Sequence, residues 1–136
     1  MTSQKYDVVL ACGGLGTRLR EITNNTPKPL YFIEGKSTLE RCIEQLDFYQ
    51  FKNVVITIGY KSNNFIEHIV ELNKKYKINI DVYVEEKPLG ECGALWIIKN
   101  DLCDDFVFIN GDLIFSIDFK KLCLFHQRLS SKLTLV

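Results

Sequence analysis

The sequence lacks a charge excess of either sign. Lysine plus arginine and aspartate plus glutamate each total 17, so the formal net charge is zero. Proteins that bind nucleic acids usually carry a basic excess, and the balance argues against a nucleic-acid partner. No apolar run approaches the length of a membrane span, and the first residues lack the layout of a signal peptide. We therefore expect neither a nucleic acid nor a membrane as a partner.

Cysteine pairs at metal-binding or redox spacing are also absent. The five cysteines are Cys12, Cys42, Cys92, Cys103 and Cys123, and none of them forms a C-x-x-C pair. Their odd number and scattered positions predict neither a disulfide framework nor a zinc site. Reduced thiols are typical of a cytoplasmic protein, and that is the location we predict.

Strand and helix patterns alternate along the chain. The predicted strands cover 6–11, 53–60, 78–86 and 105–112, and the predicted helices follow Ser37 and cover about 62–74, 90–100 and 119–128. This alternation predicts an α/β fold, a Rossmann-like, mostly parallel sheet with helices on both faces. Residues 132–136 resemble the start of a strand with nothing after it. We therefore expect the single visible domain, residues 1–136, to be incomplete at its C-terminus.

A glycine-rich stretch, "CGGLGTRLR" at 12–20, follows the first predicted strand. It is no P-loop, because no lysine followed by Ser or Thr stands at the required position. A dinucleotide fingerprint is also incomplete: Gly14 and Gly16 supply its first half, but Leu19 stands at the third glycine position. The stretch "TNNTPKPL" then leaves little room for the long helix that such a fingerprint opens. A nicotinamide-dependent oxidoreductase is therefore a weak alternative.

A loop that wraps a nucleoside triphosphate explains the stretch better. Gly13, Gly14 and Gly16 would let backbone N–H groups approach phosphate oxygens. Arg18 would add a bidentate positive clamp, and Lys28, held between two prolines, a second positive charge. A glycine turn with surface cations is the plainer alternative, but it does not explain why these residues cluster behind one strand.

Three stretches in order carry a resemblance to a known family. They are "GGLGTRLREITNNTPKPL" at 13–30, "VEEKPLGECGAL" at 84–95 and "FVFINGDLIFSIDF" at 106–119. Together they resemble the signatures of the sugar-nucleotidyltransferases, the NDP-sugar pyrophosphorylases. The resemblance implies a GT-A-like nucleotidyltransferase fold, of which residues 1–136 would form the N-terminal, nucleotide-binding part. It also implies the reaction of an NTP with a sugar 1-phosphate to give an NDP-sugar and pyrophosphate, with Mg²⁺ as cofactor.

The resemblance assigns a role to each matching residue. Arg18, Lys28 and Asp112 would be catalytic: Arg18 would stabilise the leaving pyrophosphate, Lys28 would contact the phosphates, and Asp112 would bind Mg²⁺. The remaining nucleotide-binding positions would be Leu10, Ala11, Gly13, Gly14, Gly16 and Thr17 around the first strand and its loop, and Glu85, Pro88 and Gly90 beside the base. The family's later sugar-phosphate segment and second metal-binding aspartate have no match in these 136 residues.

Details of the motifs favour one branch of the family. "TPKPL" and "PLGECGAL" look more like guanylyltransferases for mannose or heptose 1-phosphate than like thymidylyltransferases, so GTP is the NTP that we expect. Uridylyl, cytidylyl and thymidylyl enzymes stay open as alternatives. A non-catalytic regulatory or scaffold relative of the same fold is another alternative. A homo-oligomer is compatible with all of these functions. Cys12 and Cys92 depart from the family pattern, and we expect both to line one cavity that nucleotide protects.

Overall fold

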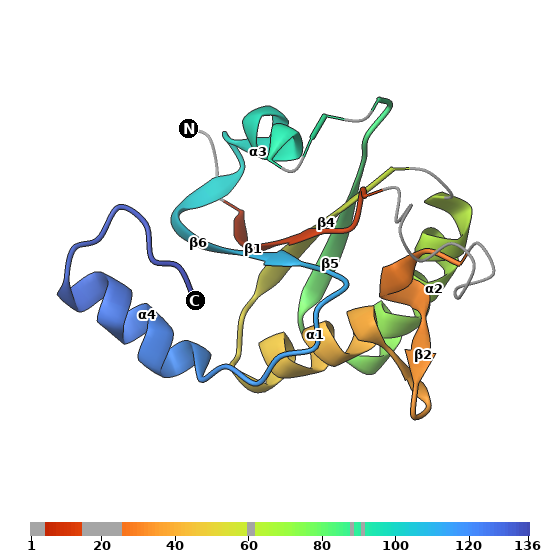
Figure 1. Cartoon of the computed structure of the whole chain (residues 1–136), viewed down its shortest axis with the longest axis horizontal. Helices are drawn as coiled ribbons and strands as arrows, with labels where there is room; N and C mark the ends of the chain where they lie inside the picture. The colour runs from red at the N-terminus through yellow and green to blue at the C-terminus, as the bar shows by residue number, and fades with distance from the viewer. Residues whose placement is uncertain (1–4, 15–25, 60–61, 88, 91) are drawn as a thin grey trace.

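The computed structural model describes residues 5–14, 26–59, 62–87, 89–90 and 92–136. A four-stranded sheet forms its centre, with helices α1, α2, α3 and α4 following its strands (Figure 1). The elements are β1 (Tyr6–Ala11), η2 (Lys28–Leu30), β2 (Phe32–Ile33), β3 (Lys36–Ser37), α1 (Thr38–Phe48), β4 (Asn53–Ile58), α2 (Ser62–Lys75), β5 (Asn79–Val84), α3 (Gly93–Ile98), β6 (Leu102–Asn110) and α4 (Phe119–Arg128). The prediction of an α/β fold is confirmed.

All neighbouring strands of the central sheet are parallel. The order is β5-β4-β1-β6, so the chain steps outward from β1 through β4 to β5 and then returns to the other side of β1. The order reverses between β1 and β6. In open parallel sheets, ligands bind outside the carboxyl ends of the strands at such a reversal. The topology therefore points to the loops that follow β1 and β6.

Helices cover both faces of the sheet, as the sequence predicts. Figure 1 shows α3 on one side and α1 with α2 on the other. Alternate residues of β1 serve the two sides: Val8 and Leu10 belong to the large core cluster under α1 and α2, and Val9 belongs to a smaller one with Ile98 of α3. The side under α1 and α2 therefore holds most of the buried apolar residues.

The helix after Ser37 begins as its sequence predicts. Ser37 is the N-cap of α1, and its Oγ accepts a hydrogen bond from the backbone N–H of Glu40 at 3.0 Å. Leu39, Ile43 and Leu46 are fully buried, so one face of α1 is fixed against the sheet. This burial makes α1 a firm support for the segments that pack on it.

Several elements differ from the sequence-based expectation. The strand predicted at 105–112 is β6, which runs from Leu102 to Asn110. The helix predicted at 90–100 is shortened to Gly93–Ile98, and residues 132–136 form no strand. A small antiparallel pair, β2 with β3, was not predicted; two-residue strands are too short to show an alternating pattern. Within the described residues, no helix has the length and apolar character needed to cross a membrane.

Candidate active site at the carboxyl edge of the sheet

Loops from all four parallel strands meet at one edge of the sheet. Backbone hydrogen bonds continue the strand pairing into these loops: Cys12 N–H donates to the carbonyl of Thr57 at 2.8 Å, and Gly111 N–H donates to that of Ala11 at 3.0 Å. On the far strand, Glu85 N–H donates to the carbonyl of Ile58 at 2.7 Å. The first residues after β1, β5 and β6 are therefore hydrogen-bonded to a neighbouring strand.

The glycine after β1 lies against a carboxylate from β5. A Cβ atom on Gly13 would lie 2.6 Å from Oε1 of Glu85, and one on Gly59 would lie 3.2 Å from the carbonyl oxygen of Gly13. Glycine at these two positions lets three strand ends approach closely. A Cβ on Gly14 would meet nothing within 4 Å. Two predicted site residues from distant motifs, Gly13 and Glu85, are thus side by side.

Lys28 and Asp112 form an ion pair across the reversal point. Their Nζ and Oδ2 atoms are 3.6 Å apart, and the two side chains are 28% and 38% exposed. Lys28 opens the short helix η2, whose next residue, Pro29, is buried. Asp112 follows β6 after a single glycine. The structure therefore joins the predicted phosphate-binding lysine to the predicted metal-binding aspartate.

Asp112 has the chemistry that a magnesium ion requires of a protein ligand. It is a partly exposed carboxylate at the carboxyl end of β6, reachable from solvent. Mg²⁺ commonly binds one or two carboxylates and completes its shell with waters and substrate phosphates. Over the residues that the structure describes, no group of three or more potential metal-ligating side chains is present. The residues fit a metal that is shared with a bound phosphate group rather than one caged by protein.

The loop before Asp112 packs tightly on a buried thiol. A Cβ atom on Gly111 would lie 2.2 Å from Sγ of Cys12, which is 6% exposed. Burial, followed by the nearby Cys42 and Asp112, raises the pKa of the Cys12 thiol far above its ordinary value. Burial and then Asp112 likewise raise the pKa of Cys42 to about 12. Both thiols therefore stay protonated and act as packing residues.

The expectation that Cys12 and Cys92 line one cavity is wrong. Cys92 is exposed and lines a hollow between α3 and β6 with Trp96 and Phe106, and Cys12 is not part of that hollow. The two cysteines stand in separate motifs, and local sequence patterns do not indicate which side of the sheet each motif faces. Cys12 lies instead beneath Gly111.

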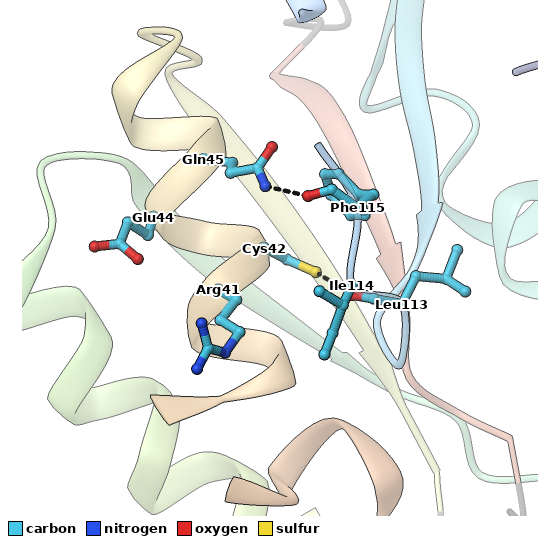
Figure 2. A pocket seen from close by; sticks show the side chains of 7 residues that line it. All are labelled: Arg41, Cys42, Glu44, Gln45, Leu113, Ile114 and Phe115. Carbon is cyan, nitrogen blue, oxygen red and sulfur yellow. Dashed lines mark hydrogen bonds between the residues drawn. The ribbon is translucent and has the colours of Figure 1, made fainter. Parts of the chain in front are cut away.

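A second hollow lies beside the segment that follows Asp112. It is lined by Arg41, Cys42, Glu44, Gln45, Leu113, Ile114 and Phe115 (Figure 2). Cys42 and Gln45 point from α1 toward this segment, and Glu44 points away from it. Cys42 Sγ donates to the carbonyl of Leu113 at 3.5 Å, and Gln45 Nε2 donates to that of Phe115. The segment after Asp112 is thus attached to α1.

The other predicted site residues are distributed as follows. Leu10 is fully buried in β1, and Ala11, the last residue of β1, is half-buried. Leu10 is therefore part of the core next to the site rather than of its surface. Gly90 has a φ of +78°, a conformation that favours glycine. Gly16, Thr17, Arg18 and Pro88 lie outside the described residues.

Sequence reasoning missed two residues that hold the site together. Thr38 Oγ1 donates to the carbonyl of Lys28 at 3.0 Å, and Gln45 holds Phe115. The one available signal was their spacing, which places both on one face of the predicted helix. That spacing alone does not say what the face contacts.

Comparison with known proteins identifies the family. The family model described as nucleotidyl transferase matches residues 6–136. Mannose-1-phosphate guanyltransferase of Yarrowia lipolytica is 34% identical over 131 residues, which are 94% of this chain and 36% of that protein. The bifunctional protein GlmU of Methanococcus maripaludis is 38% identical over 109 residues, or 80% of this chain and 25% of that protein.

A solved structure is similar to this chain in both fold and sequence. HddC from Yersinia pseudotuberculosis, in a crystal structure described as complexed with GMP-PN, superposes with a TM-score of 0.79 at 32% identity. The match covers 89% of this chain and 54% of HddC. This chain therefore spans about half of that structure and a smaller share of the curated relatives. Because the family model matches nearly the whole of this chain, residues 6–136, the chain belongs to the nucleotidyl transferase family.

Proposed function

We propose that residues 1–136 form the nucleotide-binding part of a sugar-1-phosphate guanylyltransferase. The reaction joins GTP and a sugar 1-phosphate of the mannose or heptose type into a GDP-sugar and releases pyrophosphate. The observation that carries the proposal is the ion pair between Lys28 and Asp112 at the reversal point of the sheet, with Gly13 and Glu85 at the same edge. A phosphate-binding cation, a metal-binding carboxylate and a glycine loop are the parts that such a transfer needs.

The strand order suggests how the nucleotide lies. Asp112 follows β6 and Glu85 follows β5, which are the two outer strands of the sheet. The glycine loop follows β1, which lies between them. In our proposal the triphosphate lies over the glycine loop with its reacting end toward Asp112 and its base toward Glu85.

Glu85 supports guanine as the base. A carboxylate accepts hydrogen bonds with two oxygens and donates none when ionised. Guanine offers N1–H and its 2-amino group side by side, so both oxygens gain a donor. Uracil and thymine offer a single N3–H between two carbonyl oxygens, which a carboxylate repels. The names of the guanyltransferase relative and of the HddC complex with GMP-PN support the same base.

The chemistry is an in-line displacement at phosphorus. An oxygen of the sugar 1-phosphate attacks the α-phosphorus, the new P–O bond forms, and the bond from the α-phosphorus to the bridging oxygen breaks with its electron pair leaving on pyrophosphate. Lys28 neutralises charge on the phosphates, and the resemblance gives Arg18 the same task at the leaving pyrophosphate. Asp112 would hold Mg²⁺, which supplies further neutralisation of phosphate charge when bound.

Pyrophosphate release tests the proposal. The longest natural form of this chain is incubated with Mg²⁺, each of the four common NTPs, and glucose, mannose and heptose 1-phosphates in turn. We expect release with GTP and one of the last two sugar phosphates. Binding of Mg·GTP without release for any pairing would favour a regulatory relative, and release with UTP, CTP or dTTP alone would overturn the guanylyl assignment.

A further inference from the structure

One face of α1 contacts both segments that carry the charged site residues. Thr38, Cys42 and Gln45 are spaced four and then three residues apart, so they share this face. Each donates a hydrogen bond to a backbone carbonyl: Thr38 to Lys28 at 3.0 Å, Cys42 to Leu113 at 3.5 Å, and Gln45 to Phe115. The two contacts at the segment after Asp112 are visible in Figure 2.

The central sheet holds the segment that carries Asp112 only at its start, where Gly111 N–H donates to the carbonyl of Ala11 at 3.0 Å. The last pair of β6 with β1 is Asn110 with Ala11, so the chain leaves the sheet before Asp112. Residues 113–117 have no regular secondary structure, and Lys28 lies in a short 3₁₀ turn. The hydrogen bonds from α1 therefore hold both the segment that carries Lys28 and the segment that follows Asp112.

α1 itself is well fixed. Ser37 caps its first turn, and its buried face packs on the sheet. On another side, Oε1 of Glu40 accepts from Lys75 Nζ at 2.6 Å and from Tyr76 OH at 3.1 Å. A helix with these anchors can hold the two segments at a constant separation.

We propose that Thr38 and Gln45 are positioning residues, which set the separation of the Lys28 ammonium and the Asp112 carboxylate by fixing their segments to one helix. The proposal rests on the proposed function, because the separation matters only if both groups serve one metal-bound triphosphate. Cys42 contributes less, since a thiol is a weak donor.

The test measures how strongly Mg²⁺ improves nucleotide binding. The longest natural form of this chain is titrated with a fluorescent, non-hydrolysable GTP analogue, once with Mg²⁺ and once with EDTA. The ratio of the two dissociation constants is then compared among variants. Thr38→Val and Gln45→Met each remove a donor while keeping side-chain size. We expect each to lower the ratio about three- to tenfold, the range that one hydrogen bond accounts for. Thr38→Ser keeps the hydroxyl and should restore the ratio.

A matched control separates positioning from stability. Asn73 makes the same kind of clamp elsewhere: its side chain exchanges hydrogen bonds with the backbone of Ile80 at 2.9 and 3.0 Å. Asn73→Leu should lower the melting temperature and leave the ratio unchanged. If the wild-type ratio is large and both Thr38→Val and Gln45→Met retain it, the positioning role is wrong. A wild-type ratio near one would instead overturn the metal-dependent site, and the positioning role with it.

Discussion

Lys28 and Asp112 come from motifs at opposite ends of the chain, and their charged atoms lie 3.6 Å apart. Both side chains are partly exposed, so their attraction contributes only about 0.5 kcal/mol or less to the free energy of unfolding. Such a pair does little for the fold. Its place at the reversal point of the sheet is the basis of our proposal that the pair binds a ligand carrying phosphate and a divalent cation.

Asp112→Asn should remove the effect of Mg²⁺ on GTP binding. The amide keeps the size of the side chain but lacks the charge that a hard cation prefers. The variant should bind GTP with equal affinity in Mg²⁺ and in EDTA, as measured by calorimetric titration. An undiminished Mg²⁺ effect would show that the metal is held elsewhere.

Lys28→Met should weaken GTP binding itself, whereas Asp112→Asn should remove the effect of Mg²⁺ on that binding. Loss of a charge-assisted bond to phosphate should weaken GTP binding about tenfold or more, with Mg²⁺ and without it. Because the ion pair contributes little stability, the unfolding midpoint of both variants in urea should stay close to that of the wild type. A large fall in that midpoint would contradict this description of the pair.

Gly111→Ala should destabilise the protein through a clash with Cys12. The new Cβ would lie 2.2 Å from a buried Sγ, and overpacking of this kind costs about 1–3 kcal/mol. Cys12→Ala makes room, so the double variant should recover most of the loss. The free energy of unfolding is measured in urea for the wild type, the two single variants and the double variant. Purely additive effects would mean that the two residues do not contact each other.

A thiol reagent should label the exposed cysteine, Cys92, before the buried ones. Cys92 is exposed, whereas Cys12 and Cys42 are buried with raised pKa values. Because the thiolate is the reactive form, a disulfide reagent at pH 8 should modify Cys92 rapidly and the two buried thiols only after unfolding. Cys92→Ser should remove the fast phase. Rapid modification of Cys12 or Cys42 in the native protein would contradict the packing described above.

Acid should weaken the anchor between α1 and α2. Burial raises the pKa of Glu40, but hydrogen bonds from Lys75 and Tyr76 outweigh it, and the net pKa lies below the ordinary 4.5. Because the folded-state pKa is lowered, the contribution of Glu40 to stability is present above pH 4.5 and is lost as the pH falls through the lowered value. Glu40→Gln should therefore reduce stability at pH 7 and flatten its decline in acid.

The matched control for Glu40 is Glu44 on the same helix. Its ion pair with Lys36 is exposed on both sides, at 46% and 35%. Glu44→Gln should change the urea midpoint little at pH 7 and leave the acid decline as steep as in the wild type. Equal effects of the two substitutions would mean that burial of Glu40 has no energetic consequence.

Much of this architecture follows from local sequence patterns. The strand at Tyr6–Ala11, the cap at Ser37 and the helix Phe119–Arg128 were predictable because periodicity and capping act over a few residues. The resemblance named Lys28, Glu85 and Asp112, but not that Lys28 meets Asp112 or that Glu85 lies on Gly13. Those contacts depend on strand order and register, which are set by packing between distant segments. Thr38 and Gln45 were missed for the same reason.

The most direct measurement is the dissociation constant of each of GTP, inosine triphosphate and UTP for the wild type and for Glu85→Gln, with Mg²⁺ present. Inosine triphosphate lacks only the 2-amino group of guanine. We predict that the wild type prefers GTP over inosine triphosphate and UTP, because both oxygens of Glu85 are then satisfied, and that Glu85→Gln loses about tenfold of that preference. Equal affinity of the wild type for all three nucleotides, or binding of none, would contradict a guanine nucleotide site at this edge of the sheet.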